Sequence, residues 1–112
     1  MKQVVLAITL LSTPAIADPL SGSLAGTFGF YGDKCDEAGQ GKGCVMTFEI
    51  TGEAAKKLYD RIKWKPQPDA CTEGLVKDSR NGLRCFNVAG KYSCDFGYSF
   101  LLNRMTHSDV TC

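Results

Sequence analysis

The sequence has no apolar segment long enough for a membrane span, no excess of basic residues that would make it a polycation, and a single histidine. Its only histidine is His107, and no asparagine lies in an Asn-x-Ser/Thr glycosylation motif. The most apolar stretch, Val4 to Leu11, is far shorter than the roughly 20 residues that span a bilayer. Acidic and basic residues number 12 and 13, so the chain has no strong general attraction for nucleic acid or anionic lipid.

The N-terminus has the three-part pattern of a secretory signal peptide. Lys2 is followed by the apolar run Val4 to Leu11 and then by the small residues of Ala15-Ile16-Ala17. We therefore expect residues 1–17 to be a signal peptide and residues 18–112 to be a single exported domain, periplasmic or secreted. Because no cysteine follows the cleavage site, we expect no lipid anchor. The short signal and the missing glycosylation motif favour a bacterial origin.

All six cysteines lie in the expected mature domain. An even number of cysteines in a short exported chain predicts a disulfide framework. Zinc ligands usually come in pairs two to four residues apart, whereas at least eight residues separate any two cysteines here, so we expect no metal and no cofactor. The predicted disulfide residues are Cys35, Cys44, Cys71, Cys85, Cys94 and Cys112.

Local geometry favours one set of pairings but leaves another open. If Ala89-Gly90 is a two-residue hairpin turn, Cys85 faces Cys94 at a close, non-hydrogen-bonded position, which suits a cross-strand bridge. Cys35 and Cys44 could close the polar loop between them, which would leave Cys71 for Cys112. The alternative set pairs Cys71 with Cys85 and Cys94 with Cys112.

Alternating large and small side chains predict two hairpins around one helix. Residues 27–32 and 44–50 form the first hairpin, with Phe28 and Phe30 on one face and Met46, Phe48 and Ile50 toward the core. Residues 83–88 and 91–102 form the second. Apolar residues recur at helical spacing from Ala54 to Ile62, after a start at Thr51 and with an end near Lys63.

Residues 64–82 contain two prolines and several turn residues, and we expect them to form a long surface connection. The order strand, strand, helix, strand, strand indicates a small disulfide-stapled α+β domain. Its antiparallel sheet, made of two hairpins, has the helix packed on one face.

No catalytic motif emerges from the pattern of ionisable residues. Ser108 and Asp109 flank His107, but adjacent residues cannot all point at one substrate as a catalytic triad does. Paired carboxylates could hydrolyse glycosides, and candidates on composition alone are Asp33, Asp36, Glu37, Glu49 and Glu53. The basic residues of the helix, such as Lys56 and Arg61, are typical of a solvated helix face.

These features favour a small exported bacterial envelope protein that is a non-enzymatic binding or inhibitory module. It could inhibit a cell-wall hydrolase or confer immunity to a toxin; the alternative is a small envelope hydrolase. A protein partner, an envelope enzyme or a toxin, would meet one of two loops, residues 36–42 or 77–84. The candidate partner-binding residues are Asp36, Glu37, Lys42, Lys77, Arg80 and Arg84.

One short segment has a counterpart in a known family. Residues 91–97, Lys-Tyr-Ser-Cys-Asp-Phe-Gly, followed by a terminal cysteine, are similar to the Tyr-x-Cys-x-x-Gly strand of the periplasmic C-type lysozyme inhibitors. Those proteins are also small, exported, β-rich and disulfide-bonded. The likeness covers seven residues and does not include that family's Ser-Gly-containing inhibitory loop, so it assigns no family.

Overall fold

A computed structural model describes residues 21–108 of the chain. The predicted signal peptide, residues 1–17, and the predicted disulfide residue Cys112 lie outside the described residues. Within the described range, no helix is long and apolar enough to cross a membrane.

The first predicted hairpin is present. Strands β1 (Ala25–Tyr31) and β2 (Val45–Thr51) pair antiparallel, with Phe28 opposite Phe48 and Phe30 opposite Met46. The rings of Phe28 and Phe30 meet edge to face, with centroids 6.2 Å apart, which confirms that both lie on one face of the sheet.

The second hairpin has the predicted register. Strands β5 (Arg84–Val88) and β6 (Lys91–Ser99) are joined by Ala89 and Gly90, whose φ angles of 54° and 82° are those of a type I′ turn. Cys85 faces Cys94 with Cα atoms 4.0 Å apart, and the two form a disulfide. This bond excludes the alternative set of pairings.

A second bridge joins Cys35 to Cys44, as predicted. Cys71 is also disulfide-bonded, but its predicted partner, Cys112, is not among the residues described, so that pairing stays a prediction. Disulfides persist in oxidising environments, so the domain belongs in one.

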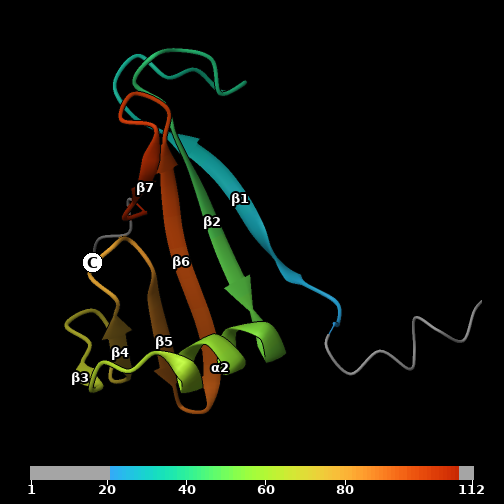
Figure 1. The fold of residues 1–112 in the computed structure, drawn as a ribbon, viewed down its shortest axis with the longest axis vertical. Helices are drawn as coiled ribbons and strands as arrows, with labels where there is room; N and C mark the ends of the chain where they lie inside the picture. The colour runs from blue at the N-terminus through green and yellow to red at the C-terminus, as the bar shows by residue number, and fades with distance from the viewer. Residues whose placement is uncertain (1–20, 109–112) are drawn as a thin grey trace, which may run out of the picture.

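The two hairpins belong to one antiparallel sheet because β2 pairs with β6. The strand order is β1-β2-β6-β5-β4-β3, and β7 (Arg104–Thr106) pairs with β6 beyond the end of β5. Figure 1 shows the resulting long, twisted sheet.

Residues 64–82 correct one prediction. They are not only a surface connection, because they contain β3 (Gln67–Pro68) and β4 (Leu75–Asp78), which extend the sheet beside β5. The predicted strand over residues 91–102 likewise ends at Ser99, where the chain turns into β7. Strand β3 is at the edge of the sheet, where proline is tolerated. It pairs only with Leu75 and Val76 of β4, so the charged residues Lys77 and Asp78 have no strand on that side.

Helix α2 (Gly52–Arg61) packs on one face of the sheet, as predicted, although it ends two residues before Lys63. Thr51 occupies the N-cap position without a side-chain capping hydrogen bond, and Glu53 lies in the first turn. The core cluster is Ala55 and Tyr59 from the helix against the Cys85–Cys94 bridge. The half-buried residues around it are Ile50, Leu58, Ile62, Leu83 and Tyr92.

Period-two alternation assigns the other strand residues to two faces. The helix packs against Ile50, Cys85 and Cys94, which defines the helix side of the sheet. Residues paired with these three across the strands, and residues two positions along the same strand, lie on that side too. Phe48 and Phe96 belong there, and Glu49 and Asp95 lie on the opposite face. Figure 1 shows α2 crossing the sheet at one end, while the 32–44 and 99–104 loops lie at the other end.

We expect replacement of both Cys85 and Cys94 by alanine to lower the free energy of unfolding by about 2 to 5 kcal/mol. Urea titration followed by circular dichroism would measure it. The matched control replaces Cys35 and Cys44, which close a ring of the same length, 9 residues apart, away from the helix. If the control loses more free energy of unfolding than the Cys85/Cys94 variant, the bridge beneath the helix is not the more important of the two.

Ala89→Asn should stabilise the second hairpin. A non-glycine residue in the left-handed region costs roughly 1 to 2 kcal/mol, and Asn-Gly is the preferred pair in a type I′ turn. We expect a gain of about 0.5 to 1 kcal/mol in the free energy of unfolding. Ala70→Asn, at an exposed alanine without a positive φ, is the control and should change stability little.

Candidate functional site

Aromatic side chains cover the part of the sheet that the helix leaves open. Phe48 stacks on Phe96 across β2 and β6, with ring centroids 4.9 Å apart. The same face continues over β1, β2 and β6. We define this aromatic face as Phe28, Phe30, Met46, Phe48, Phe96 and Tyr98, which lie in register on the helix side of the sheet.

No residue of the aromatic face is buried, and Phe28 is 66% exposed. All six phenylalanines of the chain lie in the described range, and none of them is buried. The sequence places aromatic residues correctly on one face, but the described structure covers that face only in part: Phe28 is exposed, and the other five residues are half-buried.

Two adjacent loops extend the aromatic face at the end far from the helix. In the first, residues 32–44, the amide of Gly39 donates to the carbonyl of Asp36, and Gly39 lies against the ring of Phe30. In the second, residues 100–102, three large apolar side chains are 48%, 68% and 54% exposed: Phe100, Leu101 and Leu102. The amide of Phe100 donates to the carbonyl of Cys44 and joins the loops. We call residues 100–102 the apolar tip.

Three candidate binding residues lie in the first of these loops. Asp36, Glu37 and Lys42 are exposed. The Asp36 carboxylate accepts hydrogen bonds from the amides of Ala38 and Gln40, at 3.0 and 2.8 Å, which fixes the turn at the end of the loop. With the Cys35–Cys44 bridge at its base, the loop is a protruding and preorganised element.

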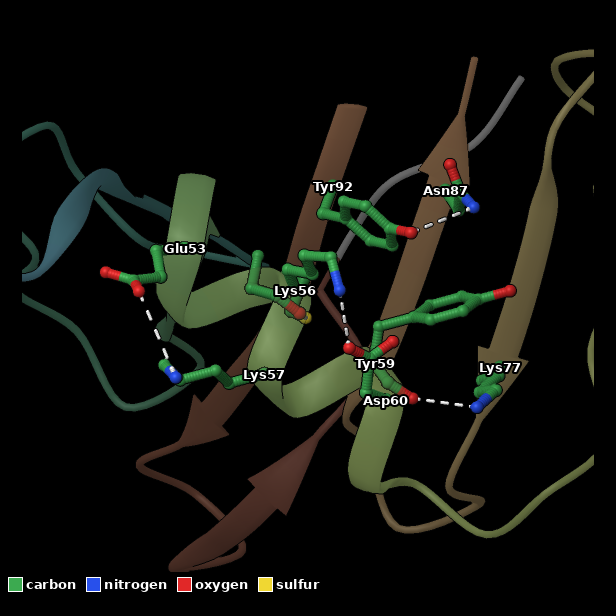
Figure 2. A network of polar contacts seen from close by, with 10 residues as sticks. Glu53, Lys56, Lys57, Tyr59, Asp60, Lys77, Asn87 and Tyr92 are labelled. Carbon is green, nitrogen blue, oxygen red and sulfur yellow. Dashed lines mark hydrogen bonds and ion pairs between the residues drawn. The ribbon is translucent and has the colours of Figure 1, made fainter. Parts of the chain in front are cut away.

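Two further candidate residues, Lys77 and Arg80, contact helix α2 and the segment that follows it. Lys77 lies in β4 rather than in a loop, and its Nζ donates to the Tyr59 carbonyl at 2.8 Å (Figure 2). It also donates to the Ile62 carbonyl at 3.2 Å, where helix α2 ends. The Arg80 guanidinium lies 4.6 Å from the centroid of the Trp64 ring. Lys77 therefore anchors the helix to the sheet.

The sixth candidate, Arg84, lines a cleft of about 450 Å³ on the face opposite the helix. Its guanidinium forms an ion pair with Asp95, 3.2 Å from Oδ1, and donates to the Ser108 hydroxyl at 3.3 Å. Glu49 also lines this cleft, directly opposite Asp95 on the neighbouring strand. Other walls come from Phe86 and Val88 of β5 and from the 69–72 loop, and Phe28 and Phe48 of the first hairpin also line the cleft.

The structure therefore separates the six candidate residues. The first three lie together in the 32–44 loop, Lys77 and Arg80 lie beside the end of α2, and Arg84 lies in the cleft. Asp95 was missed in the sequence. Asp95 directly follows Cys94, so on a strand its side chain lies on the face opposite the disulfide, and this alternation could have identified it.

Two lysines on the basic face of the helix form ion pairs with acids one turn away. Lys56 pairs with Asp60 at 2.7 Å and Lys57 with Glu53 at 3.9 Å (Figure 2). The hydrogen bond and charge of Asp60 raise the pKa of Lys56, and burial raises the pKa of Tyr59. His107, outside the cleft lining, is exposed. Within residues 21–108, no group of three or more His, Cys, Asp or Glu could hold a metal ion.

The chain matches no protein family model, no curated protein and no solved structure. Its function must therefore be inferred from its own surfaces: the aromatic face with its two loops, and the cleft.

Lys77→Met should lower the free energy of unfolding by about 1 to 3 kcal/mol, because two carbonyls lose a charged donor and methionine keeps most of the apolar contact. Chemical denaturation would measure the loss. Lys57→Met, at a side chain 74% exposed, should change stability by less than about 0.5 kcal/mol. Equal losses in both variants would refute an anchoring role for Lys77.

Proposed function

We propose that the protein is a non-enzymatic binding module of the bacterial envelope that holds a protein partner on its aromatic face. The exposure of this face is the observation that carries the proposal. Soluble monomers rarely expose contiguous apolar patches larger than a few hundred Å² unless the patch is functional. Phenylalanine, tyrosine and methionine are enriched at protein interfaces.

The surroundings of the aromatic face also suit an interface. Charged residues of the 32–44 loop, among them Asp36 and Lys42, supply the polar rim that surrounds the apolar centre of most interfaces. The disulfide at the base of this loop and the strands beneath the rings limit the conformational entropy lost on binding. Inhibition of a cell-wall hydrolase, or of a delivered toxin, would use the protruding loop and the apolar tip as the inserted element.

An envelope hydrolase is the alternative, and its acids would be Glu49 and Asp95 in the cleft. A glycosidase keeps one carboxyl group protonated in an apolar pocket. Glu49 is exposed, and Asp95 is paired with the guanidinium of Arg84. Neither has the surroundings of a catalytic proton donor, which favours a binding role.

The test uses the mature domain, immobilised, to capture proteins from envelope extracts and to titrate purified lysozymes. A captured protein is then purified and its affinity is measured against the variant Phe28→Ser/Leu101→Ser. These side chains are 66% and 68% exposed, so the fold should tolerate the change. We expect at least about tenfold weaker binding, because exposed aromatic and aliphatic anchors carry much of an interface's energy.

The control variant is Leu75→Ser, which changes an exposed leucine of β4, outside the aromatic face. It should bind the partner as the unmodified domain does. Equal affinity in the double variant, or turnover of a glycan by the domain, would refute the proposal. Sedimentation that showed a dimer, dissociated by the double variant, would assign the face to a second copy of the chain instead.

A further inference from the structure

The cleft on the face opposite the helix is lined by a continuous row of polar residues. Register places Thr27, Glu49, Asp95 and Arg84 side by side on β1, β2, β6 and β5. All four line the cleft. Its volume, about 450 Å³, lies in the range of ordinary small-ligand sites.

Asp95 is buried in this row, and only one of its two carboxylate oxygens accepts a hydrogen bond from a described residue. Its side chain is 9% exposed, and both contacts from Arg84, through Nε and Nη2, go to Oδ1 at 3.2 Å. Among the described residues, no hydrogen bond reaches Oδ2. A buried carboxylate oxygen without a donor costs free energy. The cleft therefore offers a strong acceptor to a donor from outside.

The charge of the cleft favours a cationic donor. Its lining holds three carboxylates, Glu49, Asp69 and Asp95, and one guanidinium, that of Arg84. Asp69 is occupied by the Cys71 amide and the Thr72 hydroxyl. Glu49 forms no ion pair with any described residue, although it lies directly opposite Asp95. Like charges at paired positions repel, and a cation between them would relieve that repulsion.

The apolar residues of the cleft indicate what kind of molecule carries the positive charge of the ligand. Phe86 and Val88 of β5 flank the acidic row, and such side chains pack well against an aliphatic chain. We propose that the cleft binds a primary ammonium or guanidinium group on an aliphatic arm, with its N–H groups donating to Asp95 Oδ2 and to the Glu49 carboxylate. The arm lies along Phe86 and Val88.

Calorimetric and NMR titrations of the mature domain test this site with two amines. Cadaverine represents a free diamine, and acetyl-lysine methylamide represents a lysine side chain of a protein. We expect saturable binding at millimolar concentration and at least about tenfold weaker binding to Glu49→Gln, which loses one charged acceptor. Glu53→Gln changes an exposed acid on the helix and should bind as the unmodified domain does.

Tighter binding of acetyl-lysine methylamide would assign the site to a protein's lysine, and tighter binding of cadaverine to a free amine. The proposal is refuted if neither amine saturates the site, if Glu49→Gln binds both unchanged, or if the neutral diol of the same length binds equally well. Phe28 also lines the cleft, so the variant that separates the two sites is Leu101→Ser alone. It changes an exposed residue of the apolar tip outside the cleft lining and should keep its affinity for amines, so failure of this site is distinguishable from failure of the aromatic face.

Discussion

The packing of α2 on the Cys85–Cys94 bridge is the contact on which the rest of the fold depends. It brings Ala55 and Tyr59 onto two adjacent strands and forms the buried cluster beneath the helix. A helix is about 10 Å wide, whereas the nine residues of β6 span about 30 Å. One short helix laid across the strands can therefore cover only one end of the sheet.

This mismatch of lengths explains why the molecule has so much exposed aromatic surface. Sheets bury an apolar face against another layer, and here the second layer stops near Ile50 and Cys94. Beyond that point Phe48, Phe96 and their neighbours have the composition of a core but are only half-buried. The opposite face carries a polar row because the alternate residues of the same strands include Thr27, Glu49 and Asp95, and Phe86 and Val88 of β5 lie beside that row.

The features predictable from the sequence were those set by neighbouring residues. Ala89 and Gly90 defined a two-residue turn, and this fixed the register that pairs Cys85 with Cys94. The pairing of β2 with β6 had no local signal, because it joins segments more than forty residues apart. For β3 and β4, Pro68 and the charged pair Lys77-Asp78 obscured the alternation that marks a strand.

The two candidate surfaces, the aromatic face and the cleft, also differ in how far the sequence predicts them. Alternation placed Phe28 and Phe30 on one face, but only the extent of α2 decided that this face stays open. The cleft could not be predicted, because Glu49, Asp95 and Arg84 come from three strands and meet only through the long-range register.

Each of the two described disulfides connects residues of one local segment, 9 positions apart. Loops of this length close in about 10 to 100 ns, far faster than distant strands find each other. The two thiols of each pair therefore meet readily, and the rate at which each bridge forms is set by the oxidation chemistry, which takes seconds to hours. The pairing of β2 with β6 is the long-range step of folding, and the two described bridges do little to shorten the loop that this pairing must close.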